Sequence, residues 1–228
     1  MAAITGLFFL GMLLKTYWLV PISAVGVITC ALIWVWSLGR RRPEGRLPVG
    51  RGLSLATAAE AADPPGWWGS LFLLLADGTF FGALLFGYAF LWTVAPNWPP
   101  PAYAEPGPAL LLLVALGAGL ALAGPRAGHW VVAVGSLLLG AAGIAALFLV
   151  PDPSAHAYDA TVWVLVGYGL LHHAVCLLMI AVVAARRRAG HSAATTRGAE
   201  RVSHLWSRYT ALTSLVIAAA VGLPGALT

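Results

Sequence analysis

Three ionisable side chains stand in the middle of apolar segments of this sequence: Asp77, His172 and His173. Asp77 lies within "SLFLLLADGTFFGALLFGYAFLW" and the two histidines lie within "VGYGLLHHAVCLLMI". Burying a charge in such a segment costs about several kcal/mol or more, so each group needs a polar partner. Since a helix rises 1.5 Å per residue, Asp77 and His172 both fall near the middle of a bilayer. We therefore expect an Asp77–His172 contact with a structural or proton-related role.

His173 is the second-choice partner for Asp77, and a neutral Asp77 bonded to a backbone carbonyl is the alternative. Adjacent histidines on a helix point about 100° apart, so His172 and His173 cannot hold one metal together. The remaining four histidines fall in loops or at the ends of apolar segments, and the two cysteines lie in different segments. No phosphate-binding G-x-x-x-x-G-K-[ST] loop is present. We expect no catalytic, cofactor-binding or metal site in this chain.

The elements that position these residues are predicted to be membrane-spanning helices. The chain has 228 residues, 60% apolar and 9% charged, against roughly 25% charged in a soluble domain. Five apolar runs are long enough, or nearly so, to cross a bilayer of about 30 Å: Trp67–Val94, Pro108–Ala123, Trp130–Val150, Thr161–Ala185 and Leu205–Leu223.

The first apolar stretch, Ile4 to Trp36, is too long for one upright span. Lys15 and Pro21 divide it into an interfacial or partly spanning segment and a true span from about Trp18 to Leu38. The fold class is therefore an all-α polytopic transmembrane helix bundle with six firm spans and a possible seventh. The predicted organisation is an N-terminal segment 1–38, a basic cytoplasmic linker 39–66 and a five-helix domain 67–228.

The distribution of arginine predicts the topology. The formal net charge is +5, and the arginines gather in Gly39–Arg51, at Arg126 and in Arg186–Arg201. The loops between these regions contain no Lys or Arg and carry Glu105, Asp152 and Asp159. Because positive loops stay in the cytoplasm, this alternation places the C-terminus outside, and we do not expect nucleic acid as a partner.

Three of these segments, in this order, resemble cytochrome c oxidase subunit III of the haem-copper oxidases. The acidic helix resembles the family pattern S-E-x-x-F-F, with Asp77 at the glutamate position and Phe80 and Phe81 as the aromatic pair. "VGYGLLHHAVCLLMI" is similar to the G-F-H-G-L-H helix, with Gly167 and Tyr168 at its start and His172 at its last histidine.

The last segment, "SHLWSRYTALTSLVIAAAVGL", resembles the family's final helix through Trp206. The linker "GRLPVGRGLSL" also looks like the junction in oxidases whose subunits I and III are fused. This chain departs from the family at four positions. Asp77 replaces a glutamate, Gly169 stands where the first histidine would be, and Ser207 and Thr210 replace a histidine and an aspartate.

The resemblance implies a non-catalytic subunit III of a bacterial proton-pumping cytochrome c oxidase in the inner membrane. Such a subunit packs against subunit I, with subunit II as a further partner, binds membrane phospholipid and supports proton uptake; haem and copper belong to the partner subunit. An accessory subunit of nitric oxide reductase, which tends to carry Asp in its first helix, is an alternative. A small proton-coupled transporter with Asp77 and His172 as a relay is another, although no internal repeat is evident.

Overall fold

The computed structural model describes residues 2–37, 46–56, 65–101, 103, 106–150, 152–191 and 193–227. Within these ranges the chain forms seven helices and one β-hairpin, so the predicted all-α class is confirmed apart from the hairpin. The helices are α1 (Ala2–Leu13), α2 (Leu19–Ser37), α3 (Pro65–Val94), α4 (Pro108–Ala127), α5 (His129–Leu147), α6 (Ala157–Arg188) and α7 (Ala193–Leu227).

Four of the described helices are long and apolar enough to cross a membrane: α2, α5, α6 and Gly66–Val94 of α3. The apolar part of α4, Pro108–Ala123, is shorter, and α7 begins with a polar stretch. Six or seven crossings therefore stay a prediction. Glu105 and the arginines at 40–42, which contribute to the charge alternation, lie outside the described residues.

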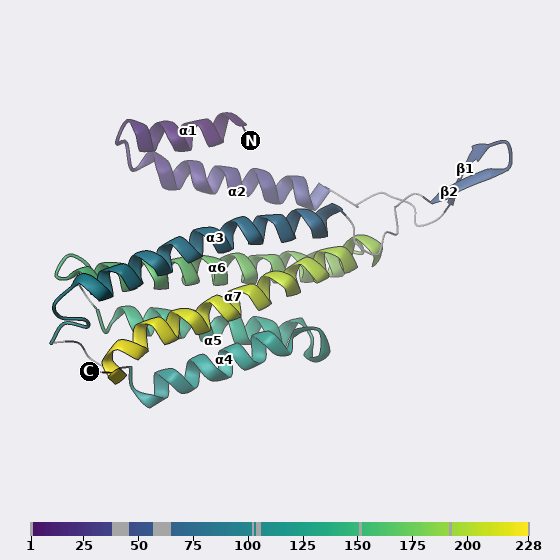
Figure 1. Cartoon of the computed structure of the whole chain (residues 1–228). Coiled ribbons are helices and arrows are strands. Elements are labelled where there is room, and N and C mark those ends of the chain that lie inside the picture. The colour runs from purple at the N-terminus through teal and green to yellow at the C-terminus, as the bar shows by residue number, and fades with distance from the viewer. Residues whose placement is uncertain are drawn as a thin grey trace. The chain divides into compact units, whose positions relative to one another are not determined.

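The chain divides into two compact units, residues 1–59 with 186–196, and residues 60–185 with 197–228. In the first unit, α1 and α2 form an antiparallel helical pair (Figure 1). The connection between them contains Lys15 with a φ of 56°, a backbone conformation that ends α1 and reverses the chain. The sequence predicts a division of the first apolar stretch at Lys15 and Pro21; the break lies at Lys15, whereas Pro21 lies within the first turn of α2.

The first unit also contains the β-hairpin, formed by β1 (Arg46–Gly50) and β2 (Leu53–Ala56) in antiparallel pairing. Its turn runs through Gly50, Arg51 and Gly52, which have φ values of 93°, 50° and 74°. Positive φ is easily reached by glycine and uncommon for arginine, so the two glycines make this turn possible. These strands lie within residues 39–66, which the sequence predicts to be a basic linker without strands.

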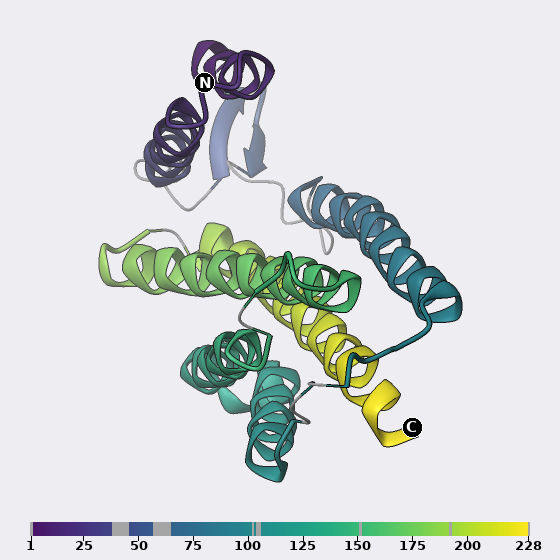
Figure 2. The same ribbon diagram turned by 90° about the vertical axis from the view of Figure 1, so that its left-hand side faces the viewer.

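In the second unit each of the five helices α3 to α7 runs antiparallel to the helix before it (Figure 1). The C-terminus lies at the same end of this bundle as the α3–α4 and α5–α6 connections, and Figure 2 gives the view turned by 90°. The α4 and α5 backbones approach closely through glycine. A Cβ on Gly135 would lie 2.5 Å from the backbone nitrogen of Ala121, and one on Gly117 would lie 3.1 Å from the backbone oxygen of Gly135. Small residues are the usual means of close helix packing in membranes.

Tyrosine hydroxyls tie the C-terminal end of α7 to the rest of the bundle. Pro224 lacks an N–H, so the carbonyl of Ala220 loses its helical donor. The hydroxyl of Tyr88 on α3 donates to that carbonyl at 2.6 Å. Tyr158 on α6 donates to the next carbonyl, that of Val221, at 3.1 Å. These bonds connect α3 and α6 to α7 around a buried aromatic cluster.

Candidate functional site

Asp77 on α3 accepts hydrogen bonds from two other helices through a single carboxylate oxygen, Oδ2. The hydroxyl of Tyr168 on α6 donates to this oxygen, and the hydroxyl of Tyr209 on α7 donates to it at 2.6 Å. Nε2 of His172 on α6 lies 3.0 Å from the same atom. The structure thus brings together Asp77 and His172, and its partners for Asp77 are side chains rather than the backbone carbonyl of the alternative interpretation.

Helical spacing explains why two of these groups come from α6. Tyr168 and His172 are four residues apart, so they lie on one face of the helix, one turn apart, with ring centroids 4.1 Å apart. Tyr209 approaches from α7, and its hydroxyl oxygen lies 2.7 Å from that of Tyr168. Three oxygen–oxygen contacts thus join Asp77 Oδ2 to Tyr168, Asp77 Oδ2 to Tyr209, and the two tyrosine hydroxyls to each other. The two hydroxyls supply only two protons, so when both donate to Asp77 the contact between the tyrosines has no proton.

The backbone of α6 determines how many protons the Asp77–His172 pair holds. Nδ1 of His172 lies 2.8 Å from the carbonyl oxygen of Tyr168, one turn earlier. A carbonyl oxygen only accepts, so Nδ1 carries a proton. The contact between Nε2 and Oδ2 then contains one proton, held either by the imidazole or by the carboxyl group. In both arrangements the pair has no net charge, which lowers the cost of placing it inside a membrane.

His173 does not contact Asp77. Its Nε2 lies 2.9 Å from the hydroxyl of Ser214 on α7, and its side chain is buried. Ser214 in turn donates to the Thr210 carbonyl at 2.8 Å, so His173 is the donor to Ser214. The two adjacent histidines thus point to different neighbours, as the 100° helical rotation predicts.

Aromatic rings cover the network on two sides. Phe81 is buried and stacks on Tyr168, with centroids 5.0 Å apart and an interplanar angle of 16°. Trp206 on α7 stacks on His172 at 5.7 Å and 13°. Phe80 is 57% exposed, and its ring centroid lies 6.2 Å from that of Tyr168 at an interplanar angle of 51°. The Asp77 side chain retains 22% exposure, so the cover is incomplete on the α3 side.

The hydrogen bonds to Asp77 described above come from none of the other three positions that depart from the resemblance. A Cβ on Gly169 would lie 3.3 Å from Ile217 on α7, so this position packs against α7. Ser207 is buried and donates to the Ala121 carbonyl of α4 at 3.4 Å. Thr210, also buried, donates to the Trp206 carbonyl of its own helix at 2.9 Å. These side chains take part in helix packing.

Tyr168 and Tyr209 are the site residues that sequence reasoning missed. Tyr168 was noted only as the start of a motif, and Tyr209 was not singled out. The four-residue spacing from Tyr168 to His172 places both on one face, and this was the available signal. Tyr209 has no comparable signal, because its role depends on the rotation of α7 about its own axis.

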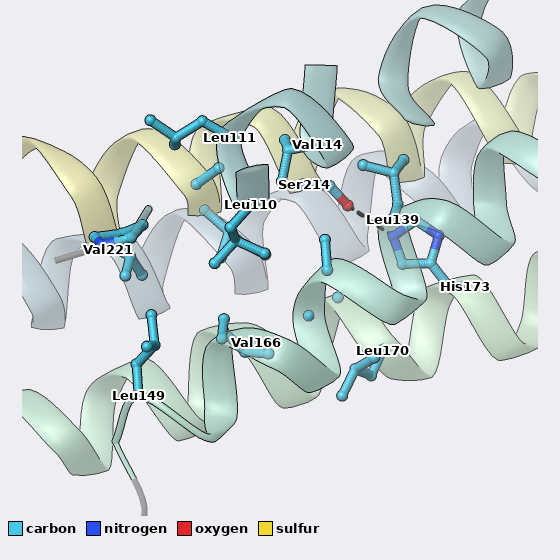
Figure 3. A pocket seen from close by; sticks show the side chains of 17 residues that line it. Leu110, Leu111, Val114, Leu139, Leu149, Val166, Leu170, His173, Ser214 and Val221 are labelled. Atoms are coloured by element: carbon cyan, nitrogen blue, oxygen red, sulfur yellow. Dashed lines mark hydrogen bonds between the residues drawn. The ribbon is translucent and has the colours of Figure 1, made fainter. Parts of the chain in front are cut away.

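Helices α4, α5, α6 and α7 enclose a cleft in which aliphatic side chains predominate (Figure 3). Its volume is about 70 Å³, counted as space for the centre of a water-sized molecule. His173 and Ser214 provide its polar wall, and Figure 3 shows the hydrogen bond between them. Within the described residues no three His, Cys, Asp or Glu side chains come together to hold a metal.

The chain matches no protein-family model and no curated protein sequence. The resemblance to subunit III therefore stays an expectation from the sequence motifs.

Proposed function

We propose that this chain is a non-catalytic, integral-membrane subunit of a haem-copper oxidase that resembles subunit III of a bacterial proton-pumping cytochrome c oxidase. It would cross the inner membrane six or seven times with its C-terminus outside and pack against subunits I and II. Haem and copper would reside in the partner subunit. Phospholipid would bind between its helices, and the chain would stabilise subunit I and support its proton uptake.

One observation carries this proposal: residues from all three motif segments meet around one carboxylate. Asp77 and Phe81 come from α3, Tyr168 and His172 from α6, and Trp206 from α7. The resemblance predicts that these three helices pack together, and contacts that join residues about 130 positions apart in the sequence agree with this expectation. The neutral Asp77–His172 pair also suits a group that holds a proton inside the membrane.

Co-purification tests the proposal. An affinity-tagged chain expressed in its own host should retain a haem-containing membrane partner, which optical spectra of the eluate would reveal. Oxygen consumption by that complex would support the oxidase, whereas nitric oxide reduction would favour the alternative accessory role. A chain that elutes alone and drives proton-coupled uptake in vesicles would contradict both and favour a transporter.

The variant Asp77→Asn should weaken retention of this partner. Thr79→Val is the matched control, because Thr79 is exposed on the same helix and its hydroxyl donates to the Ala76 carbonyl of α3 at 2.6 Å. Equal retention by the two variants would show that the Asp77 network is not needed for assembly.

A further inference from the structure

The β-hairpin of Arg46–Ala56 presents aliphatic side chains that nothing in its own two strands covers. Val49, Leu53 and Leu55 are 57%, 62% and 58% exposed. Leu53 and Leu55 are two residues apart on β2, so they share one face, and Ser54 between them points to the other. A two-stranded hairpin is marginally stable in water on its own, and this one needs a surface to cover its apolar face.

The length of the chain limits where such a surface can be. From Ser37, at the end of α2, to Arg46 is nine residue steps (46 − 37), and from Ala56 to Pro65, where α3 begins, is also nine (65 − 56). A fully extended chain spans at most about 3.6 Å per residue, so either connection reaches about 32 Å. Because α2 is apolar enough to cross a membrane, the hairpin can lie no farther than about this distance from the membrane surface at which α2 ends, so this surface is within its reach.

The charge of this segment complements an anionic surface. Residues 39–51 contain five arginines and one glutamate. Arg51 is exposed at the tip of the hairpin, between two glycines. A basic side chain next to exposed aliphatic residues is the pattern of segments that insert shallowly among negatively charged headgroups.

We propose that this hairpin docks on anionic lipid headgroups of the same membrane, with Leu53 and Leu55 at the boundary between headgroups and acyl chains and Arg51 on lipid phosphate. Arg51 then binds lipid as well as adding to the positive charge that orients the chain. The proposal is independent of the oxidase assignment, because it requires only that α2 and α3 are embedded in a membrane.

A fluorophore sensitive to polarity, attached to Leu53→Cys in the full chain, tests the docking. Cys30→Ala removes the accessible native thiol, and Cys176 is fully buried. The chain is reconstituted in phosphatidylcholine vesicles with and without one third phosphatidylglycerol. In the anionic vesicles the emission should shift to the blue and be quenched by a lipid-borne quencher, and high salt should reverse both effects.

Ser54→Cys, labelled in the same way, is the matched control and should show a smaller shift, because it faces away from the lipid. Arg51→Gln should lower the ratio of docked to free hairpin about fivefold. The reason is that each basic residue near an anionic surface raises this ratio by about that factor. Identical spectra in neutral and anionic vesicles would overturn the proposal. A blue shift that appears only when a second protein is added would also overturn it and indicate a protein partner.

Discussion

Replacing the acid of the central network tests how strongly it holds α3 to α6 and α7. In Asp77→Asn the amide group can point either its oxygen or its nitrogen at the site of Oδ2. With oxygen there, the tyrosine hydroxyls keep their acceptor, but Nε2 of His172 faces an acceptor with no proton between them. With nitrogen there, His172 gains a donor and the tyrosines lose their acceptor. Each orientation breaks at least one of three interhelical contacts.

The size of the effect follows from this count. Interhelical side-chain hydrogen bonds in membrane proteins contribute about 0.6 kcal/mol on average, with a maximum of about 1.7. Asp77→Asn should therefore lower the free energy of unfolding by about 0.6 to 1.7 kcal/mol. Asp77→Leu, which removes all three contacts, should lower it by about 2 kcal/mol (three times 0.6) or more, because His172 is also left buried without its partner.

Unfolding in mixed micelles by a denaturing detergent, followed by circular dichroism, measures these values. A double-mutant cycle isolates the contact itself: Asp77→Asn with His172→Gln should give a coupling energy of about 0.5 to 1.5 kcal/mol. The same cycle with His173→Gln is the control and should give a value near zero, since His173 contacts Ser214. Equal coupling energies in the two cycles, or a coupling energy near zero in both, would show that Asp77 and His172 are not in contact.

Three further changes probe other parts of the chain. Gly135→Ala should lower the free energy of unfolding by about 1 to 3 kcal/mol, because its Cβ would collide with α4, whereas Gly140→Ala on the same helix, with its nearest atom at 4.0 Å, should have little effect. Tyr88→Phe should cost about 1 kcal/mol in the same unfolding assay, because a carbonyl of α7 loses its donor. The hydroxyl of Ser154, and to a smaller extent its backbone N–H, hold the pKa of Asp152 below its ordinary value. The stability that these two hydrogen bonds give the folded chain is therefore complete above the ordinary pKa and is lost as the pH falls through the lowered pKa. Ser154→Ala should raise the pKa of Asp152 in an NMR titration, and an unchanged midpoint would contradict this.

The helices could be predicted because the thickness of the bilayer determines how many consecutive apolar residues a membrane-spanning helix needs. Their ends could not. The sequence predicts a last span beginning at Leu205, but α7 begins at Ala193, and α6 continues through Arg188. A helix does not stop at the membrane surface, since backbone hydrogen bonds continue wherever no residue breaks them. The hairpin in the linker was missed although Leu47 and Val49 alternate with Pro48, and Leu53 and Leu55 with Ser54, on the two sides of a glycine-rich turn. Its strands have only five and four residues, and two apolar residues in each make a weak signal.

Of the candidate site, the sequence predicts only how deep each residue lies in the membrane. Counting residues places Asp77 and His172 at a similar level, and an acid inside a membrane has few partners to choose from. Choosing His172 over His173, or finding Tyr209, requires the rotation of each helix about its axis, which side-chain packing decides. Tyrosine is also common near membrane surfaces, so its presence in a span carries little information by itself.

Asp77, at the position where the resemblance predicts a glutamate, finds polar partners in spite of its shorter side chain. Aspartate is one methylene shorter, and Nε2 of His172 still lies within 3.0 Å. The two tyrosine hydroxyls give Asp77 two more donors. Because the backbone carbonyl of Tyr168 fixes the proton on Nδ1 of His172, the remaining proton can move between His172 and Asp77 without changing the net charge of the pair. The same contacts that hold three helices together therefore leave one proton free to shift within them, and a packing role and a proton-related role for Asp77 do not exclude each other.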